Sequence, residues 1–221
     1  MDSYKKKSSI LTYPIDGETD WYYYPTPDTI RGDEPWQIIT RCWEDHKNKY
    51  FKNLPLSRRD VIITAGAHVG LHVRFYASMF KRVYAFEPHP FSFWCMVNNA
   101  QSDNVIKMQC ALGNEHKLIN LDLSGTNGHL DYHISKNTDS AWIPMITIDS
   151  MNLDKCDMIQ LDVENYEFET LIGARETINK YHPLIVMENG DTPEISQFMQ
   201  GRDYRIDCKT AYDTIWIPGE M

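Results

Sequence analysis

The stretch that decides the fold is Val61-Ile-Ile-Thr-Ala-Gly-Ala-His-Val-Gly70, followed further on by Val83-Tyr-Ala-Phe-Glu-Pro88. An apolar, β-branched run enters a tight turn with glycines at positions 66 and 70, and a second apolar run ends on a glutamate. Apolar runs with little alternation are typical of strands in a sheet that is covered on both faces. The two runs and the stretch between them therefore predict a βαβ unit.

The turn after the first run has the composition of a nucleoside-binding loop. Gly66 and Gly70 let backbone N–H groups approach a ligand where a Cβ would collide, and the helix that follows offers unpaired N–H groups. Glu87 lies about 20 residues after the first glycine, where a ribose-binding acid is expected. Two glycines can also serve only to pack a helix on a strand, and a strand-terminal glutamate is often a solvated charge. The combination favours a nucleoside-containing ligand.

From Asp60 onward, predicted strands and helices alternate. The strands are predicted at 61–66, 83–87, 105–112, 157–163, 183–188 and 214–218. The helices are predicted at 70–80, 91–100, 165–182 and 192–200. This alternation predicts an α/β fold with a doubly wound, Rossmann-like sheet, whose ligand crevice lies at the carboxyl ends of the strands.

Two regions depart from the alternation. Within 114–149, short strands at 118–123 and 131–134 around a glycine turn predict an inserted β-hairpin, followed by a strand at 145–148. Residues 1–58, rich in Tyr, Trp, Pro and Asp with one helical candidate at 34–50, are predicted to be an N-terminal extension packed on the core. Residues 59–221 would then form the main domain.

The bulk composition narrows the classes of protein. Of the 221 residues, 42% are hydrophobic and 24% charged, which is ordinary for a soluble globular domain. A net charge of −9 argues against a nucleic-acid partner, and no apolar run approaches the length of a membrane span. The N-terminus lacks the apolar core of a signal peptide. Five scattered cysteines favour reduced thiols and a cytoplasmic location.

Seven motifs, which include the glycine turn and the run that ends at Glu87, carry a specific resemblance. They are Ala65-Gly-Ala-His-Val-Gly70, Tyr84-Ala-Phe-Glu-Pro-His-Pro90, Cys110-Ala-Leu-Gly113, Thr147-Ile-Asp149, Leu161-Asp-Val-Glu164 with Tyr166-Glu167, Leu171-Ile-Gly-Ala174 and Pro183-Leu-Ile-Val-Met-Glu188. In this order they resemble the FkbM family of S-adenosylmethionine-dependent methyltransferases. The resemblance implies a class I methyltransferase sheet, seven-stranded with its last strand antiparallel. It also implies S-adenosyl-L-methionine as cofactor and O-methylation of a hydroxyl on a sugar, a glycan or a small metabolite.

The same resemblance implies which residues hold the cofactor. By position they are Thr64, Gly66, Ala67, His68, Gly70, Glu87, Pro88, Ala111, Leu112 and Asp162. The glycine turn would cradle the methionine end, Glu87 would hold the ribose, and Ala111 with Leu112 would flank the adenine.

The sequence departs from the family pattern at two positions. Thr64 stands where the family usually has Asp, and the hypothesis that this weakens cofactor affinity is checked by comparing the dissociation constants of the wild type and Thr64→Asp. Asn165 replaces a glycine, a change expected to be mild because Asn tolerates left-handed φ and caps helices well.

Catalysis is assigned to Asp162 and Glu164. An alcohol needs a general base to become a good nucleophile, and Asp162 is the predicted base. Along an extended chain the two side chains point to opposite sides, so only one is expected to face the acceptor. Glu164 would support the site or contact substrate, or would only be a charge favoured at a helix N-terminus.

Other functions remain open at this stage. A nicotinamide-dependent oxidoreductase is disfavoured because His68 stands where that fingerprint needs glycine. A cofactor-binding protein without catalysis is motivated by Thr64. The histidine pairs 68/72 and 129/133 lack a third ligand at a diagnostic spacing, so no metal site is predicted. His89 and Glu188 could face the same crevice or be surface residues. The predicted partner is a small-molecule or glycan acceptor, with neither nucleic acid nor membrane.

Overall fold

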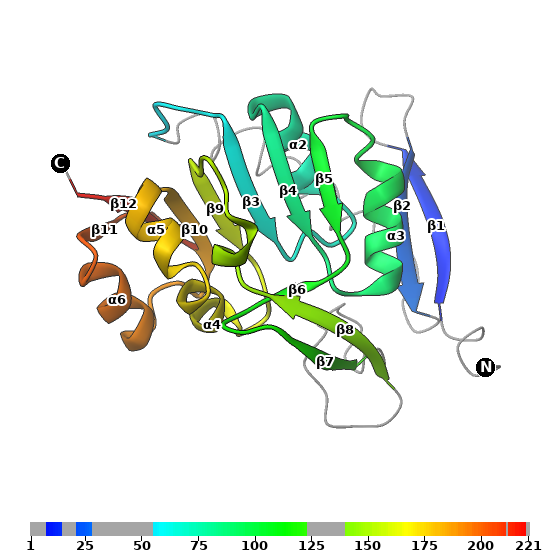
Figure 1. Cartoon of the computed structure of the whole chain (residues 1–221). Coiled ribbons are helices and arrows are strands. Elements are labelled where there is room, and N and C mark those ends of the chain that lie inside the picture. Colours follow the sequence, from blue (N-terminus) through cyan, green and yellow to red (C-terminus); the bar gives the residue numbers. More distant parts are fainter. Residues whose placement is uncertain (1–7, 15–20, 28–54, 123–139, 211, 220–221) are drawn as a thin grey trace.

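The computed structural model describes residues 8–14, 21–27, 55–122, 140–210 and 212–219 (Figure 1). The strands are β1 (Ser8–Pro14), β2 (Trp21–Pro27), β3 (Val61–Ala65), β4 (Arg82–Phe86), β5 (Val105–Met108), β6 (Ala111–Leu112), β7 (Lys117–Asp122), β8 (Ser140–Ile146), β9 (Met158–Leu161), β10 (Leu184–Glu188), β11 (Tyr204–Lys209) and β12 (Asp213–Pro218). The helices are α2 (Leu71–Met79), α3 (Pro90–Asn99), α4 (Glu167–Ile172), α5 (Arg175–Tyr181), α6 (Pro193–Gln200) and the 3₁₀ turn η3 (Asp149–Met151).

Seven of these strands form one sheet in the order β11-β12-β10-β9-β3-β4-β5. The pairs that link β10, β9, β3, β4 and β5 are parallel, whereas β12 is antiparallel to both of its neighbours. The sequence-based prediction of a doubly wound sheet with its last strand antiparallel is therefore confirmed.

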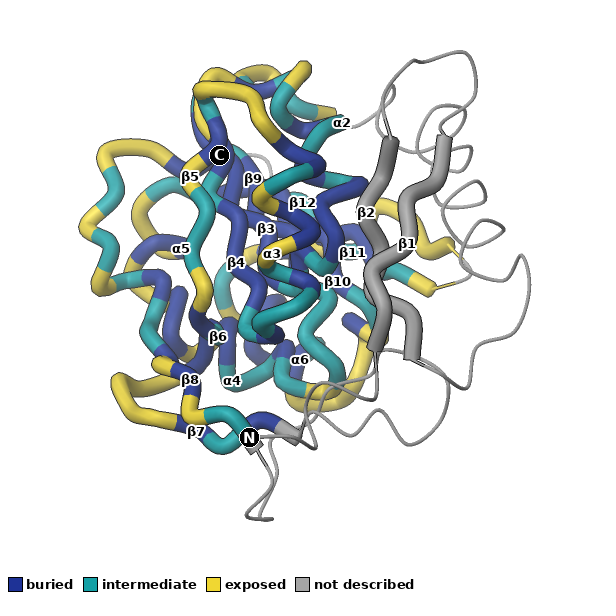
Figure 2. The backbone as a smooth tube through the Cα atoms, turned by 90° about the vertical axis from the view of Figure 1, so that its right-hand side faces the viewer, coloured by how far each residue is buried: buried dark blue, intermediate teal, exposed yellow. Residues whose placement is uncertain are grey.

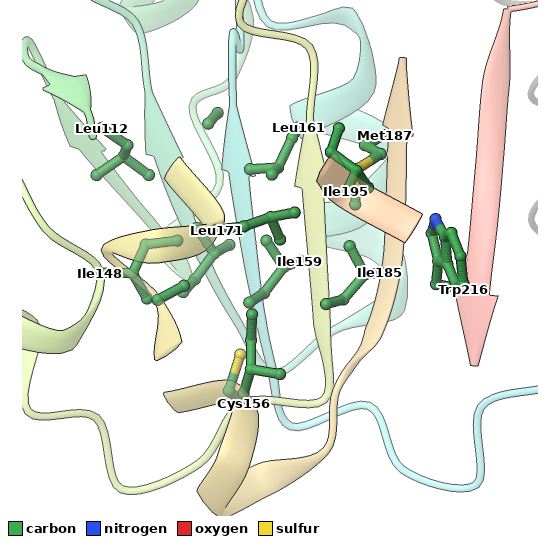
Figure 3. Packing of buried hydrophobic residues seen from close by; sticks show 14 of the residues in the cluster. Leu112, Ile148, Cys156, Ile159, Leu161, Leu171, Ile185, Met187, Ile195 and Trp216 are labelled. Carbon is green, nitrogen blue, oxygen red and sulfur yellow. The ribbon is translucent and has the colours of Figure 1, made fainter. Parts of the chain in front are cut away.

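Helices cover both faces of this sheet, which explains why the strands are continuously apolar. Ile62 of β3 packs in a cluster with residues of α2 and α3, while the next residue, Ile63, packs on the opposite face with residues of α4, α5 and α6. Both side chains are fully buried. Figure 3 shows the second cluster, which includes Ile159, Leu171 and Trp216. Exposed residues lie mainly on the surrounding helices and loops (Figure 2).

Two predicted elements are divided in the structure. The strand predicted at 105–112 becomes β5 and β6, because β6 leaves the central sheet and pairs with β8. The helix predicted at 165–182 becomes α4 and α5, which meet at Gly173. A Cβ at Gly173 would lie 1.9 Å from the carbonyl oxygen of Gly113, so the two helices meet at a point where another segment passes too closely for a side chain. Strand β11 was not predicted, because most of its residues are at least partly exposed.

The inserted region forms a second, three-stranded sheet in the order β6-β8-β7. Strand β8 is parallel to β6 and antiparallel to β7. The sequence predicted a strand close to β7, but the partner predicted at 131–134 lies outside the described residues, and β8 begins at Ser140. Ile119, Leu121, Ile143 and Met145 form a small core of their own.

The N-terminal region contributes an antiparallel pair, β1 and β2, and β2 lies beside α3 (Figures 1 and 2). The helix predicted at 34–50 is outside the described residues, and the boundary at residue 58 stays a prediction. Within the described ranges, no helix has both the length and the apolar character needed to cross a bilayer.

Candidate functional site

The site lies at the carboxyl ends of the parallel strands. Figure 1 shows the small sheet of β6, β7 and β8 beyond the carboxyl ends of β3 and β4. In a doubly wound sheet this edge is the ligand-binding edge. The turn after β3, the end of β4 and the ends of β9 and β10 therefore meet at the predicted crevice.

The glycine turn after β3 has an unusual backbone. Gly66 and Gly70 have φ of 74° and 87°, and His68 between them has φ of 48°. A Cβ at Gly66 would lie 1.6 Å from the carbonyl oxygen of Asp162, and a Cβ at Gly70 would lie 3.1 Å from the side chain of Met96. Tight packing thus accounts for both glycines, and it brings the turn directly against the segment that follows β9.

Glu87 is buried and connects two segments of the site. One carboxylate oxygen accepts the N–H of His68 at 2.7 Å, and the other accepts the N–H of His89 at 2.8 Å. With 5% of its surface exposed, it is not a solvated charge. Since a carboxylate has about four lone-pair positions, two remain for hydroxyl donors. Burial raises the pKa of Glu87 to about 7, against the two backbone hydrogen bonds, which lower it.

This raised pKa predicts a pH-dependent stability. The folded state favours protonated Glu87. The contribution of this protonation to the free energy of unfolding is therefore complete below about pH 4.5, and it is lost as the pH rises through about 7. The loss amounts to about 3 kcal/mol at most. Glu87→Gln should remove this dependence. In denaturant unfolding without cofactor, the stability of the variant relative to the wild type should therefore be higher at about pH 8 than at about pH 5. The exposed Glu194→Gln should keep the wild-type dependence, and identical slopes for all three proteins would contradict the assignment.

Thr64 lies in β3, fully buried, and its hydroxyl donates a hydrogen bond to Oε1 of Gln160 in the neighbouring strand β9. Its side chain is therefore engaged with the sheet. The hypothesis that Thr64 weakens cofactor affinity stays a prediction, and a carboxylate introduced at this position would have to be accommodated beside the Gln160 amide.

Thr64→Val, which replaces the hydroxyl by a methyl group, should lower the free energy of unfolding by about 1–3 kcal/mol, because Oε1 of Gln160 loses its buried donor. Thr64→Ser keeps the donor and should cost about 1 kcal/mol for the lost methyl group. Urea unfolding of the three proteins measures the difference. A valine variant as stable as the wild type would show that this hydrogen bond contributes nothing.

Three carboxylates converge at the ends of β9 and β10. Oxygen atoms of Asp162, Glu164 and Glu188 all lie within 4.8 Å of one another. The expectation that Asp162 and Glu164 point to opposite sides is wrong, because β9 ends at Leu161 and Glu164 adopts a left-handed φ of 54°. Asp213, at the start of β12, pairs in register with Glu188 and adds a fourth acid to this edge.

The acidic surroundings alter proton affinity. The pKa of Asp162 is raised well above its usual value, first by burial and then by the charges of Glu188, Glu164, Asp213 and Glu167. Burial, with a further effect of Glu188, raises the pKa of Asp213 to about 6. A carboxylate in a crevice with a raised pKa is suited to accept a proton near neutral pH. Oxygen atoms so close together also suit a hard cation, but acidic groups gather without one as well, and the absence of a metal site stays a prediction.

The predicted adenine-flanking residues lie on β6, the edge strand of the three-stranded sheet. Leu112 is 3% exposed and its side chain belongs to the main core, while its carbonyl accepts the hydroxyl of Thr170 at 3.2 Å. Any contact of Leu112 with a ligand would therefore be made by its backbone. Ala111 and Pro88 are partly exposed, and their roles stay predictions.

Sequence reasoning misjudged or missed several residues near the site. His89 is buried and its Nδ1 accepts the N–H of Ser92, so it caps α3. The Pro that follows it was the available signal for a helix start. Glu167, 5% exposed, accepts the N–H of Val163 at 3.1 Å. Burial lowers the pKa of His68 to about 4, so this imidazole is neutral at pH 7. His129 and His133 lie outside the described residues.

Comparison with one solved structure supports the fold. This chain is similar to a structure of Methyltransferase FkbM from Methylobacillus flagellatus KT, with 18% identity and a TM-score of 0.54 over 76% of this chain and 46% of that one. It thus spans just under half the length of that protein. Precorrin-6y C5,15-methyltransferase from Geobacter metallireducens GS-15 matches with 12% identity and a TM-score of 0.48 over 93% of this chain and 100% of that one. None of the curated proteins matches.

Strand order, the glycine turn and the acids at the carboxyl edge define a Rossmann-like fold of the class I methyltransferase type. Residues 65–206 match the family described as "Methyltransferase FkbM domain", which is more than half of the chain. The protein therefore belongs to the FkbM methyltransferase family, and the resemblance seen in the sequence is confirmed.

Proposed function

We propose that this protein transfers a methyl group from S-adenosylmethionine to a hydroxyl group of a sugar, a glycan or a small metabolite. The observation that carries the proposal is the contact between the glycine turn and the segment after β9. Because a Cβ at Gly66 would overlap the carbonyl oxygen of Asp162, the predicted base lies next to the predicted cofactor loop. Family membership supports the same chemistry.

The residues present fit such a cofactor. The turn at Gly66–Gly70 lies directly against the segment that follows β9. The buried carboxylate of Glu87 retains lone pairs for two ribose hydroxyls. Ala67, His68, Pro88, Ala111 and Leu112 would complete the contacts. When bound, the cofactor would supply an electrophilic methyl group on a sulfonium.

The chain itself would position and deprotonate the acceptor. Methyl transfer is an in-line displacement, so orientation and exclusion of water supply much of the catalysis. The carboxylate of Asp162 would accept the hydroxyl proton, which its raised pKa favours. Glu164, whose carboxylate lies beside that of Asp162, would hold another polar group of the acceptor. A small-molecule or glycan acceptor agrees with the net charge of −9, which disfavours nucleic acid.

Two experiments test the proposal. Thermal-shift measurements should show stabilisation by S-adenosylmethionine and S-adenosylhomocysteine and none by NAD; stabilisation by NAD alone would favour the oxidoreductase instead. Release of S-adenosylhomocysteine should then be measured with panels of sugars, glycans and hydroxylated metabolites. If S-adenosylmethionine binds but no S-adenosylhomocysteine is released with any acceptor, a cofactor-binding protein without catalysis would be favoured.

A further inference from the structure

The segment that joins β9 to α4 has an unusual backbone. Glu164 and Asn165 are consecutive non-glycine residues with left-handed φ of 54° and 68°. L-residues adopt this region reluctantly, and such a turn persists only when its surroundings hold it. Its consequence is functional, because the turn directs Glu164 to the side on which Asp162 lies.

The residue that spans this turn is Glu167. Its carboxylate reaches back across the two left-handed residues and accepts the N–H of Val163 at 3.1 Å. Only 5% of Glu167 is exposed, so water does not compete freely for this bond.

Burial raises the pKa of Glu167, while the hydrogen bonds from its own N–H and from that of Val163 lower it. A carboxyl group in either protonation state keeps an acceptor oxygen for Val163.

The far end of the turn is also held. Tyr166 packs against the small core of the inserted sheet, and its carbonyl accepts the N–H of Thr170. The N–H of Asp162 donates to the carbonyl of Ala65 in β3. With both flanks fixed by other elements, the bond that the Val163 N–H donates to Glu167 spans the left-handed residues themselves.

We propose that Glu167 is a positioning residue, whose bond to the Val163 N–H fixes the left-handed turn and so keeps the carboxylates of Asp162 and Glu164 on the same side of the crevice. Its relevance to catalysis rests on the proposed methyltransferase function. Glu167 acts through Asp162 and Glu164 and does not itself touch the acceptor.

The test compares Glu167→Ala, which removes the acceptor, with Glu167→Gln, which keeps a neutral acceptor oxygen of similar reach. Glu169→Ala, a truncation of a partly buried glutamate on the same helix, is the matched control. Amide hydrogen exchange followed by NMR should show Val163 protected in the wild type, Glu167→Gln and Glu169→Ala. In Glu167→Ala its protection should fall roughly tenfold or more, while β9 keeps its protection.

Kinetics add a readout that a purely structural role would not move. With an acceptor that supports release of S-adenosylhomocysteine by the wild type, Glu167→Ala should lower kcat by roughly 10- to 100-fold. Its affinity for S-adenosylmethionine should stay within about twofold of the wild type, and Glu167→Gln should restore most of the rate.

The outcomes separate this role from the proposed chemistry, because exchange needs neither cofactor nor acceptor. Rapid exchange of Val163 in the wild type, or unchanged protection in Glu167→Ala, would overturn the role of Glu167. If Glu167→Ala does not fold, loss of protection at Val163 in Glu167→Gln would overturn it instead. If the protection of Val163 follows the prediction but no acceptor supports turnover, the role of Glu167 in the turn would be supported. That result would count against the methyltransferase proposal alone.

Discussion

Replacing Gly66 with alanine is expected to lower the free energy of unfolding by more than about 3 kcal/mol and to abolish binding of S-adenosylmethionine. The new Cβ would lie 1.6 Å from the carbonyl oxygen of Asp162 and 2.7 Å from its carbonyl carbon, so the backbone itself must move. A left-handed φ adds about 1–2 kcal/mol for a residue with a Cβ, and overpacking adds about 1–3 kcal/mol. Thermal unfolding and calorimetric titration with the cofactor measure the two effects.

The control is Gly201→Ala at the end of α6. There the nearest atom to a new Cβ is a carbonyl oxygen at 3.2 Å, and φ is −65°. This variant should unfold within about 1 kcal/mol of the wild type and bind the cofactor normally. If Gly66→Ala behaved like Gly201→Ala, the close contact between the glycine turn and Asp162 would be refuted.

Asp162→Asn is expected to reduce turnover by about 100-fold or more while leaving binding of S-adenosylmethionine measurable. Asparagine keeps the shape of the side chain but accepts no proton at neutral pH. In the wild type the base must be ionised, so the rate should fall as the pH decreases through the raised pKa of Asp162. Release of S-adenosylhomocysteine, measured across pH with an active acceptor, tests both statements.

Asp213→Asn is the matched control, since it removes an acid from the same edge and retains Asp162. The charge of Asp213 contributes to the raised pKa of Asp162. The acidic limb of the rate profile should therefore move to lower pH, with the plateau rate retained. Equal activity of Asp162→Asn and the wild type would eliminate Asp162 as the base.

Local sequence determined the elements of the central sheet. Apolar runs such as Val61–Ala65 can only be buried on both faces, and the alternation with helices leaves few ways to arrange them. Where polar and apolar side chains are mixed, as in β11, the sequence pattern was too weak to predict a strand. Gly173 stood in the sequence inside a continuous helical pattern, and only the approach of Gly113 shows why a side chain does not fit there.

The grouping of the candidate site at one edge of the sheet was predictable for the same reason, because parallel strands present their carboxyl ends together. The residues of the glycine turn, Glu87 and Asp162 were therefore predicted from position and resemblance. Their hydrogen-bond partners were not predicted, because nearly every residue has the same backbone N–H and carbonyl groups and the sequence does not show which of them will pair. That His68 and His89 would donate to Glu87, or Val163 to Glu167, depends on segments meeting in space.

The sequence alone thus determined the fold class and the family, because burial and strand direction follow from local pattern. Only the tertiary structure decided the directions of the acidic side chains. Extended geometry placed Asp162 and Glu164 on opposite sides, and a left-handed turn brings them together. The physical reason is that such a turn is unfavourable locally, so contacts from other segments must hold it.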